Sequence, residues 1–240
     1  MSRLSNYINF IKMILLKPKL LFSQYDSCFN NYVYSDTINL FTHNILKEYL
    51  LEEILDELGL QRPVVDIDYK KNNRNGSVSA YKLRIIVELV LAKKPKTLLE
   101  IGTFEGRTTF NLAKNLKDQT QIFAMNLPQN QCNFEVGKFF KDTEFSKHIT
   151  QIYADSTKYD FSCLPSFDFV FIDGGHDYDT VLKDSINVYQ KLNPNGIILW
   201  DDVDLNHLGS TQAIFDFCKK YDLDMKIISG ASAAITWRER

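Results

Sequence analysis

Two strings of residues in this chain of 240 residues could perform chemistry. In the first, FDFVFIDGGHDYD, Asp173 is followed by two glycines and His176; in the second, GIILWDDVD, Asp201 stands beside Asp202. A carboxylate at a strand end can bind a hard divalent ion. An imidazole with an ordinary pKa near ~6.5 is suited to removing a proton close to neutral pH. The two strings therefore predict a site that combines a base with a cation.

Three carboxylates in one cleft repel one another unless a cation neutralises them. Carboxylate oxygens favour Mg²⁺, Mn²⁺ or Ca²⁺ over zinc, so Asp173, Asp201 and Asp202 are predicted to hold a divalent ion, with Mg²⁺ as the first choice. The alternative is a tight turn at Asp173 and a solvated acidic loop after Asp202. His207 is expected at the surface or facing the substrate.

Alternating strand and helix patterns must position these residues. The apolar runs that predict strands cover residues 97–101, 121–125, 149–153, 167–172, 196–200, 225–229 and 233–237, and helical patterns lie near 80–93, 106–117, 131–142, 178–192 and 210–221. This alternation predicts an α/β fold, with a Rossmann-like seven-stranded, mostly parallel sheet and helices on both faces. The short SGAS turn predicts an antiparallel final hairpin. Ligands of such sheets bind beyond the carboxyl ends of the strands.

The turn after the first of these strands, in LLEIGTFEGRTT, is a candidate ligand cradle. Gly102 and Gly106 allow main-chain N–H groups to face a ligand, and Thr108 opens the next helix. Glu100 could accept hydrogen bonds from a cationic amino group. The string is neither a phosphate loop nor a dinucleotide fingerprint, because Phe104 replaces the second glycine of the latter.

The motifs EIGTFEG and FIDGGHD resemble those of class I S-adenosylmethionine-dependent methyltransferases, most closely the metal-dependent small-molecule O-methyltransferases. The resemblance covers about residues 80–237. It implies that Asp173 and the acidic pair hold the metal and that His176 is the general base. The predicted cofactor-binding residues are Glu100, Gly102, Thr103, Phe104, Gly106, Thr108, Asn126, Asp155, Ser156 and Asp173.

The chain departs from that family after the second strand, where an acid usually binds both ribose hydroxyls. Asn126 stands there, and an amide lacks the charge that strengthens such hydrogen bonds. The alternative role for Asn126 is to cap a turn before Pro128. Asp155 and Ser156 fall where the resemblance places contacts to adenine, and capping a helix is their alternative role.

The chain before the motifs is predicted to be a helical extension, residues 1–75, followed by the methyltransferase domain, residues 76–240. Apolar spacing predicts helices over residues 5–17 and 36–58, and the polar string at 70–77 predicts a linker. The first helix could pack on the domain or in a homodimer, or lie as a basic amphipathic helix on a membrane surface.

Composition limits the classes of partner. The net charge is -2, with 28 basic and 30 acidic residues, which argues against a nucleic-acid partner. Four widely spaced cysteines indicate reduced thiols and a cytoplasmic location. No run reaches the roughly 18 apolar residues that a membrane span requires.

Together these features predict transfer of a methyl group from S-adenosylmethionine to a hydroxyl of a small molecule, a sugar or a phenol. The alternatives are a metal-independent methyltransferase of the same fold, an NAD-dependent oxidoreductase and a non-catalytic binding protein. The sequence does not identify the methyl acceptor.

Overall fold

The computed structural model describes residues 47–69, 77–116, 120–204 and 206–239. The chain divides into two units, residues 1–45 and 46–240, and every described residue belongs to the second. The predicted helix over residues 5–17, with its dimer or membrane contact, lies outside the described residues, as does most of the predicted linker. Within the described ranges, no helix has both the length and the apolar character to cross a membrane.

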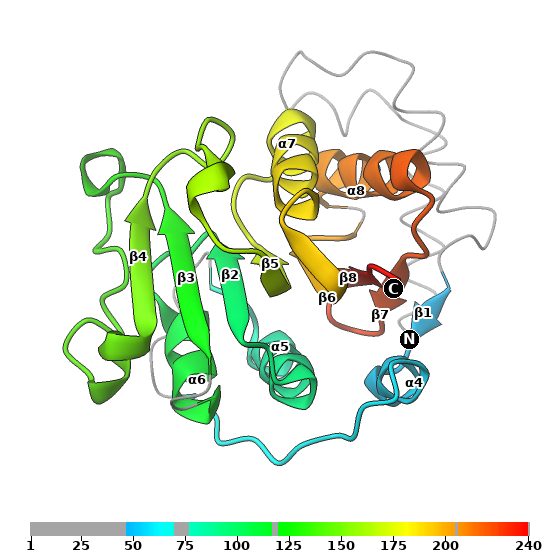
Figure 1. Ribbon diagram of the computed structural model, residues 1–240, viewed down its shortest axis with the longest axis horizontal. Coiled ribbons are helices and arrows are strands. Elements are labelled where there is room, and N and C mark those ends of the chain that lie inside the picture. Colours follow the sequence, from blue (N-terminus) through cyan, green and yellow to red (C-terminus); the bar gives the residue numbers. More distant parts are fainter. Residues whose placement is uncertain (1–46, 70–76, 117–119, 205, 240) are drawn as a thin grey trace, which may run out of the picture. The chain divides into compact units, whose positions relative to one another are not determined.

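An eight-stranded sheet forms the centre of this unit, in the order β1-β7-β8-β6-β5-β2-β3-β4 (Figure 1). The strands are β1 (Glu48–Tyr49), β2 (Thr97–Ile101), β3 (Gln121–Asn126), β4 (Ile149–Tyr153), β5 (Phe167–Ile172), β6 (Leu192–Asp201), β7 (Lys226–Ile228) and β8 (Ala233–Trp237). Strand β8 runs antiparallel to β6 and β7, and the other neighbours are parallel. The mostly parallel sheet and the final hairpin are confirmed, with eight strands in place of the predicted seven.

The additional strand, β1, lies in the segment predicted as a helix over residues 36–58. In the described part of that segment, only α4 (Leu51–Glu57) is helical. Tyr49 pairs in parallel with β7, its carbonyl accepts the Ser229 N–H at 2.9 Å, and the Lys226 ammonium lies 4.7 Å from its ring centroid. The helix prediction was wrong at 48–49 because these residues pair with backbone groups that β7 would otherwise leave unpaired. The helical spacing of apolar residues is a local signal and does not reveal such a distant partner.

Helices cover both faces of the sheet, as predicted (Figure 1). The helices α4, α5 (Ala80–Lys93) and α6 (Arg107–Leu116) lie on one face, and α7 (Tyr178–Tyr189) and α8 (Leu208–Tyr221) lie on the other. Along β5, Phe169 and Phe171 pack into the core that also contains residues of α4, α5 and α6. Val170 and Ile172 pack into the core that also contains residues of α7 and α8. Burial on both faces explains why the strand reads as an unbroken apolar run.

The predicted helix near residues 131–142 is absent from the structure. This segment forms turns that follow a 3₁₀ turn, η2 (Gln129–Gln131). Gly137 has a φ of 71°, and its N–H donates to the Phe104 carbonyl at 2.9 Å, while the Phe139 N–H donates to the Glu105 carbonyl at 2.9 Å. The prediction failed because these two N–H groups bond to the turn after β2 and not to carbonyls one helical turn earlier in the segment.

The chain order reverses between β2 and β5, because β3 follows on one side and β6 on the other. The carboxyl ends of parallel strands meet at one edge of the sheet, and this reversal opens a crevice between the loops that follow β2 and β5. The fold thus brings the turn at Gly102 beside the turn at Asp173.

Candidate active site

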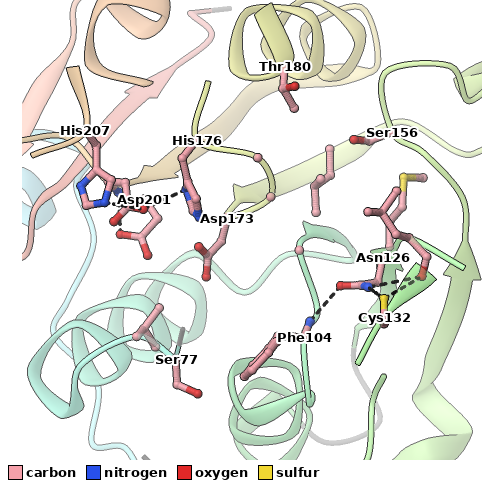
Figure 2. Close-up of a pocket in the computed structure, with 18 of the residues that line it drawn as sticks. Ser77, Phe104, Asn126, Cys132, Ser156, Asp173, His176, Thr180, Asp201 and His207 are labelled. Atoms are coloured by element: carbon pink, nitrogen blue, oxygen red, sulfur yellow. Dashed lines mark hydrogen bonds and ion pairs between the residues drawn. The ribbon is translucent and has the colours of Figure 1, made fainter. Parts of the chain in front are cut away.

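A cavity of about 930 Å³ lies at the carboxyl ends of β2 to β6. Its walls also include the segment that precedes α5 and the turn that precedes β8. Figure 2 shows Asp173, His176, Asp201 and His207 on one side of the cavity and Phe104, Asn126 and Cys132 on the other. The cavity is therefore divided into an acidic side with imidazoles and a side formed by the glycine-containing turn.

The turn after β2 can be built only with glycine at position 102. Gly102 has a φ of 97°, and its N–H donates to the Met125 carbonyl at 2.8 Å. A Cβ at this position would lie 1.8 Å from the Asp173 carbonyl oxygen, well inside van der Waals contact. The turn thus packs directly against the end of β5, which aligns the two halves of the cavity.

Asn126, at the end of β3, holds this turn in place. Its Oδ1 accepts the Phe104 N–H at 3.0 Å, and its Nδ2 lies 3.4 Å from the Cys132 sulfur and donates to the Leu127 carbonyl at 3.3 Å (Figure 2). An amide oxygen has a second lone pair, so Asn126 can still accept a hydrogen bond from a ligand hydroxyl. The residue lines the cavity where the sequence predicted a ribose contact.

Glu100, which was predicted to bind the cofactor, lies outside the lining of the cavity. Its side chain is buried, and its Oε2 accepts a hydrogen bond from the Thr109 hydroxyl. Burial raises the pKa of Glu100 to about 8. The carboxyl is therefore mostly protonated at neutral pH and supports the turn from beneath.

Three other predicted cofactor residues also lie behind the cavity wall. The Thr103 hydroxyl donates to the Met125 carbonyl at 3.2 Å, and Thr108 is buried in the first turn of α6. Gly106 has a φ of 85° and packs so closely on Phe140 that a Cβ would lie 2.6 Å from its ring. These residues fix the shape of the turn but do not line the cavity.

Asp155 and Ser156 line the cavity after β4. The Asp155 carboxylate accepts hydrogen bonds from the Lys158 ammonium at 2.8 Å and from the Thr157 hydroxyl at 2.6 Å, and these bonds lower its pKa. The Ser156 carbonyl accepts a hydrogen bond from the Asn187 amide at 3.3 Å. Asp155 thus stabilises the turn after β4 that forms part of the cavity wall.

The three aspartates predicted to converge do lie along one side of the cavity. Burial and the nearby charges of Asp201 and Asp202 raise the pKa of Asp173 well above its usual value. Burial also raises the pKa of Asp201. The convergence follows from the fold, because β5 and β6 are parallel neighbours that end together.

Lys82, a residue outside the predicted site, lies among these acids. Its ammonium forms an ion pair with Asp201 Oδ1 and lies 3.8 Å from Asp202 Oδ1. Within the described ranges, no group of three or more histidine, cysteine or acidic side chains is arranged to hold a metal ion. The geometry therefore does not fit the predicted divalent ion at Asp173, Asp201 and Asp202. The sequence did contain a sign that Lys82 is buried, because Lys82 lies three and four residues before Ile85 and Ile86, on the buried face of α5.

His176 is paired with Asp202. Its Nδ1 lies 2.9 Å from Asp202 Oδ2, and this hydrogen bond raises the pKa of His176. His207 Nε2 lies 3.5 Å from the same oxygen, and His207 Nδ1 lies 2.9 Å from Asp204 Oδ1. Burial alone would raise the pKa of Asp202, but the hydrogen bond from His176 and the neighbouring charges lower it. With Nδ1 engaged, Nε2 is the nitrogen of His176 that remains for a ligand.

Residues 99–203 match a family model described as a methyltransferase domain. A protein of Acanthamoeba polyphaga mimivirus, uncharacterised protein R132, is 29% identical over 147 residues, which are 56% of this chain and 64% of that protein. The chain thus spans less than two thirds of the length of this relative.

Solved structures share the fold of the described unit. The O-methyltransferase TomG of Streptomyces achromogenes, solved with S-adenosylmethionine, superposes with a TM-score of 0.56 at 16% identity, covering 83% of this chain and 94% of TomG. The methyltransferase PaMTH1 of Podospora anserina, solved with S-adenosylhomocysteine, gives 0.55 at 15% identity, covering 90% and 99%. These likenesses show that the described unit has the class I methyltransferase fold.

Proposed function

We propose that the protein transfers a methyl group from S-adenosylmethionine to a hydroxyl group of a small molecule. The observation that carries this proposal is the His176–Asp202 hydrogen bond, which lies in the same cavity as the turn at Gly102. The match to a methyltransferase domain supports the choice of donor. A bound donor would supply a methyl group activated by a positively charged sulfur.

The donor would be held on the side of the cavity that carries the glycine-containing turn. Gly102, Phe104 and Asn126 line this side, and Asp155 and Ser156 continue it. The cavity volume of about 930 Å³ is ample for a nucleoside with an amino-acid tail and a small acceptor beside it. The second lone pair of the Asn126 amide oxygen suits one ribose hydroxyl.

His176 would act as the general base. Asp202 accepts the Nδ1 proton of its imidazole, so Nε2 presents a lone pair toward an acceptor hydroxyl. When Nε2 takes the proton, the Asp202 carboxylate stabilises the imidazolium that forms. A positioned general base contributes about 10²–10⁴-fold to a rate.

The remaining wall of the cavity suits a hydroxylated acceptor such as a sugar or a phenol. The wall is formed by small residues, Ser77 to Ser79 before α5 and Gly230 to Ser232 before β8. Among the described residues, the buried Ser77 Oγ has no hydrogen-bond partner. A buried hydroxyl without a partner is costly, so an acceptor hydroxyl could satisfy it.

The proposal can be tested by following transfer of a labelled methyl group to a panel of sugars and phenols. His176→Ala should lose about 10²–10⁴-fold in rate while its affinity for the donor stays unchanged, because His176 acts on the acceptor. His148→Ala is the matched control, because this histidine does not line the cavity. Equal rates for wild type and His176→Ala would contradict the assigned role of His176.

A further inference from the structure

Lys82 is a buried cation that contacts the acidic side of the cavity. Its residue is 8% exposed, and its ammonium pairs with Asp201, which is 9% exposed. Ser79 caps α5 by accepting the Lys82 N–H at 3.1 Å, so the backbone at Lys82 is fixed by the start of the helix. The apolar stem of lysine can lie along the core while its ammonium reaches the cavity.

Three of the four carboxylate oxygens of Asp201 and Asp202 already face a cation or a hydrogen-bond donor. Asp201 Oδ1 accepts from both the Lys82 ammonium and the Asp202 N–H, the latter at 2.7 Å. Asp202 Oδ1 faces Lys82 at 3.8 Å, and Asp202 Oδ2 is paired with His176 at 2.9 Å. A divalent ion at this place would have to displace a buried ammonium and compete with an imidazole.

We propose that the Lys82 ammonium is the permanent cation of this carboxylate cluster, so that the protein binds no divalent ion there. Lys82 then acts as a positioning residue: it holds Asp201 and Asp202 in place, and through Asp202 it fixes His176. Its part in methyl transfer rests on the proposed function, whereas occupancy of the cluster by an ion can be measured without any methyl acceptor.

The experiment is a titration of the protein with Mn²⁺, in which free Mn²⁺ is followed by its electron paramagnetic resonance signal. Wild type and Asp201→Asn should bind Mn²⁺ equally. Lys82→Met removes the charge and keeps the apolar stem, so it should gain one Mn²⁺ site bound more than about tenfold more tightly than any in wild type, since a positive charge roughly 4 Å from the ion is lost. The gain should vanish in the double variant Lys82→Met/Asp201→Asn.

A wild-type Mn²⁺ site that disappears in Asp201→Asn would overturn the proposal, as would a folded Lys82→Met protein that gains no site. If Lys82→Met does not fold, the comparison of wild type with Asp201→Asn decides alone, because equal binding supports the proposal and a lost site refutes it. Neither readout depends on the donor, so a failure of the proposed methyl transfer would leave this test intact.

Discussion

Asp184 on α7 is a carboxyl group buried beneath the cavity. Its exposed fraction is 0%, and the Ser156 side chain offsets only part of the rise that burial causes in its pKa. A Cβ placed on Gly174, which lines the cavity, would lie 3.7 Å from Asp184 Oδ2. Burial raises the pKa of Asp184 from 3.8 to about 7. The group therefore titrates within the range in which the folded protein can be studied.

The sign of its effect on stability follows from the raised pKa. The folded state binds the proton more tightly than the unfolded state, so stability is lost as the pH rises from about 4 to about 7, and the loss is constant above that. A shift of this size corresponds to about 4 kcal/mol at pH 8, of which roughly 3 kcal/mol develops between pH 5 and pH 8. Asp184→Asn removes this titration. Its free energy of unfolding should therefore change by about 3 kcal/mol less over that interval than that of wild type.

Urea unfolding at pH 5 and pH 8, followed by tryptophan fluorescence, measures this difference. Asp179→Asn is the matched control, because Asp179 is exposed on the same helix. Its stability should differ from wild type by less than about 1 kcal/mol at both pH values. If the unfolding free energies of wild type and Asp184→Asn change in parallel with pH, the carboxyl is ionised in the folded protein and the reasoning is refuted.

Three further substitutions test the cavity. Gly102→Ala should lower the melting temperature far more than Gly59→Ala, since both positions have positive φ but only the first would clash with the end of β5; equal losses in a thermal melt would contradict this. Asn126→Asp should bind S-adenosylmethionine up to about tenfold more tightly, because a carboxylate strengthens a hydrogen bond to ribose. Calorimetry measures this affinity, and weaker binding would exclude a ribose contact. Asp202→Asn should slow methyl transfer by about 10²-fold or more, because His176 loses the partner that orients it; an unchanged rate would argue against the pair.

The strands were predictable because their signal is local. The apolar runs at 97–101, 149–153, 167–172 and 233–237 match the observed bounds of β2, β4, β5 and β8. A strand buried on both faces needs apolar side chains at consecutive positions, so its sequence records its surroundings directly.

The elements that sequence reasoning missed depend on distant partners. Strand β1 has only two residues, and its pairing with β7 joins segments that lie far apart along the chain. The segment 131–142 has helical spacing, but the N–H groups of Gly137 and Phe139 bond to the turn after β2. Neither partner is visible in a local window of residues.

In the candidate site, too, some features follow from local sequence patterns and others depend on distant partners. Parallel strand ends must meet, so the convergence of Asp173 with Asp201 and Asp202 could be predicted from the order of apolar runs. The contact between Lys82 and Asp201 joins residues 119 positions apart, and it depends on how α5 packs against the sheet. For this reason the sequence predicted the negative charges of the cluster but not the cation that pairs with them.

The cavity is proposed to bind S-adenosylmethionine, and thermal unfolding in the presence of this donor measures that binding. The melting temperature is measured with S-adenosylmethionine or with NAD⁺, each at millimolar concentration and with EDTA present. A donor at about 100 times its dissociation constant stabilises by about 2.7 kcal/mol, which corresponds to roughly 5–10 °C for a chain of this size. We expect such a shift with S-adenosylmethionine and none with NAD⁺. No shift with the donor, or a shift with NAD⁺ alone, would contradict it.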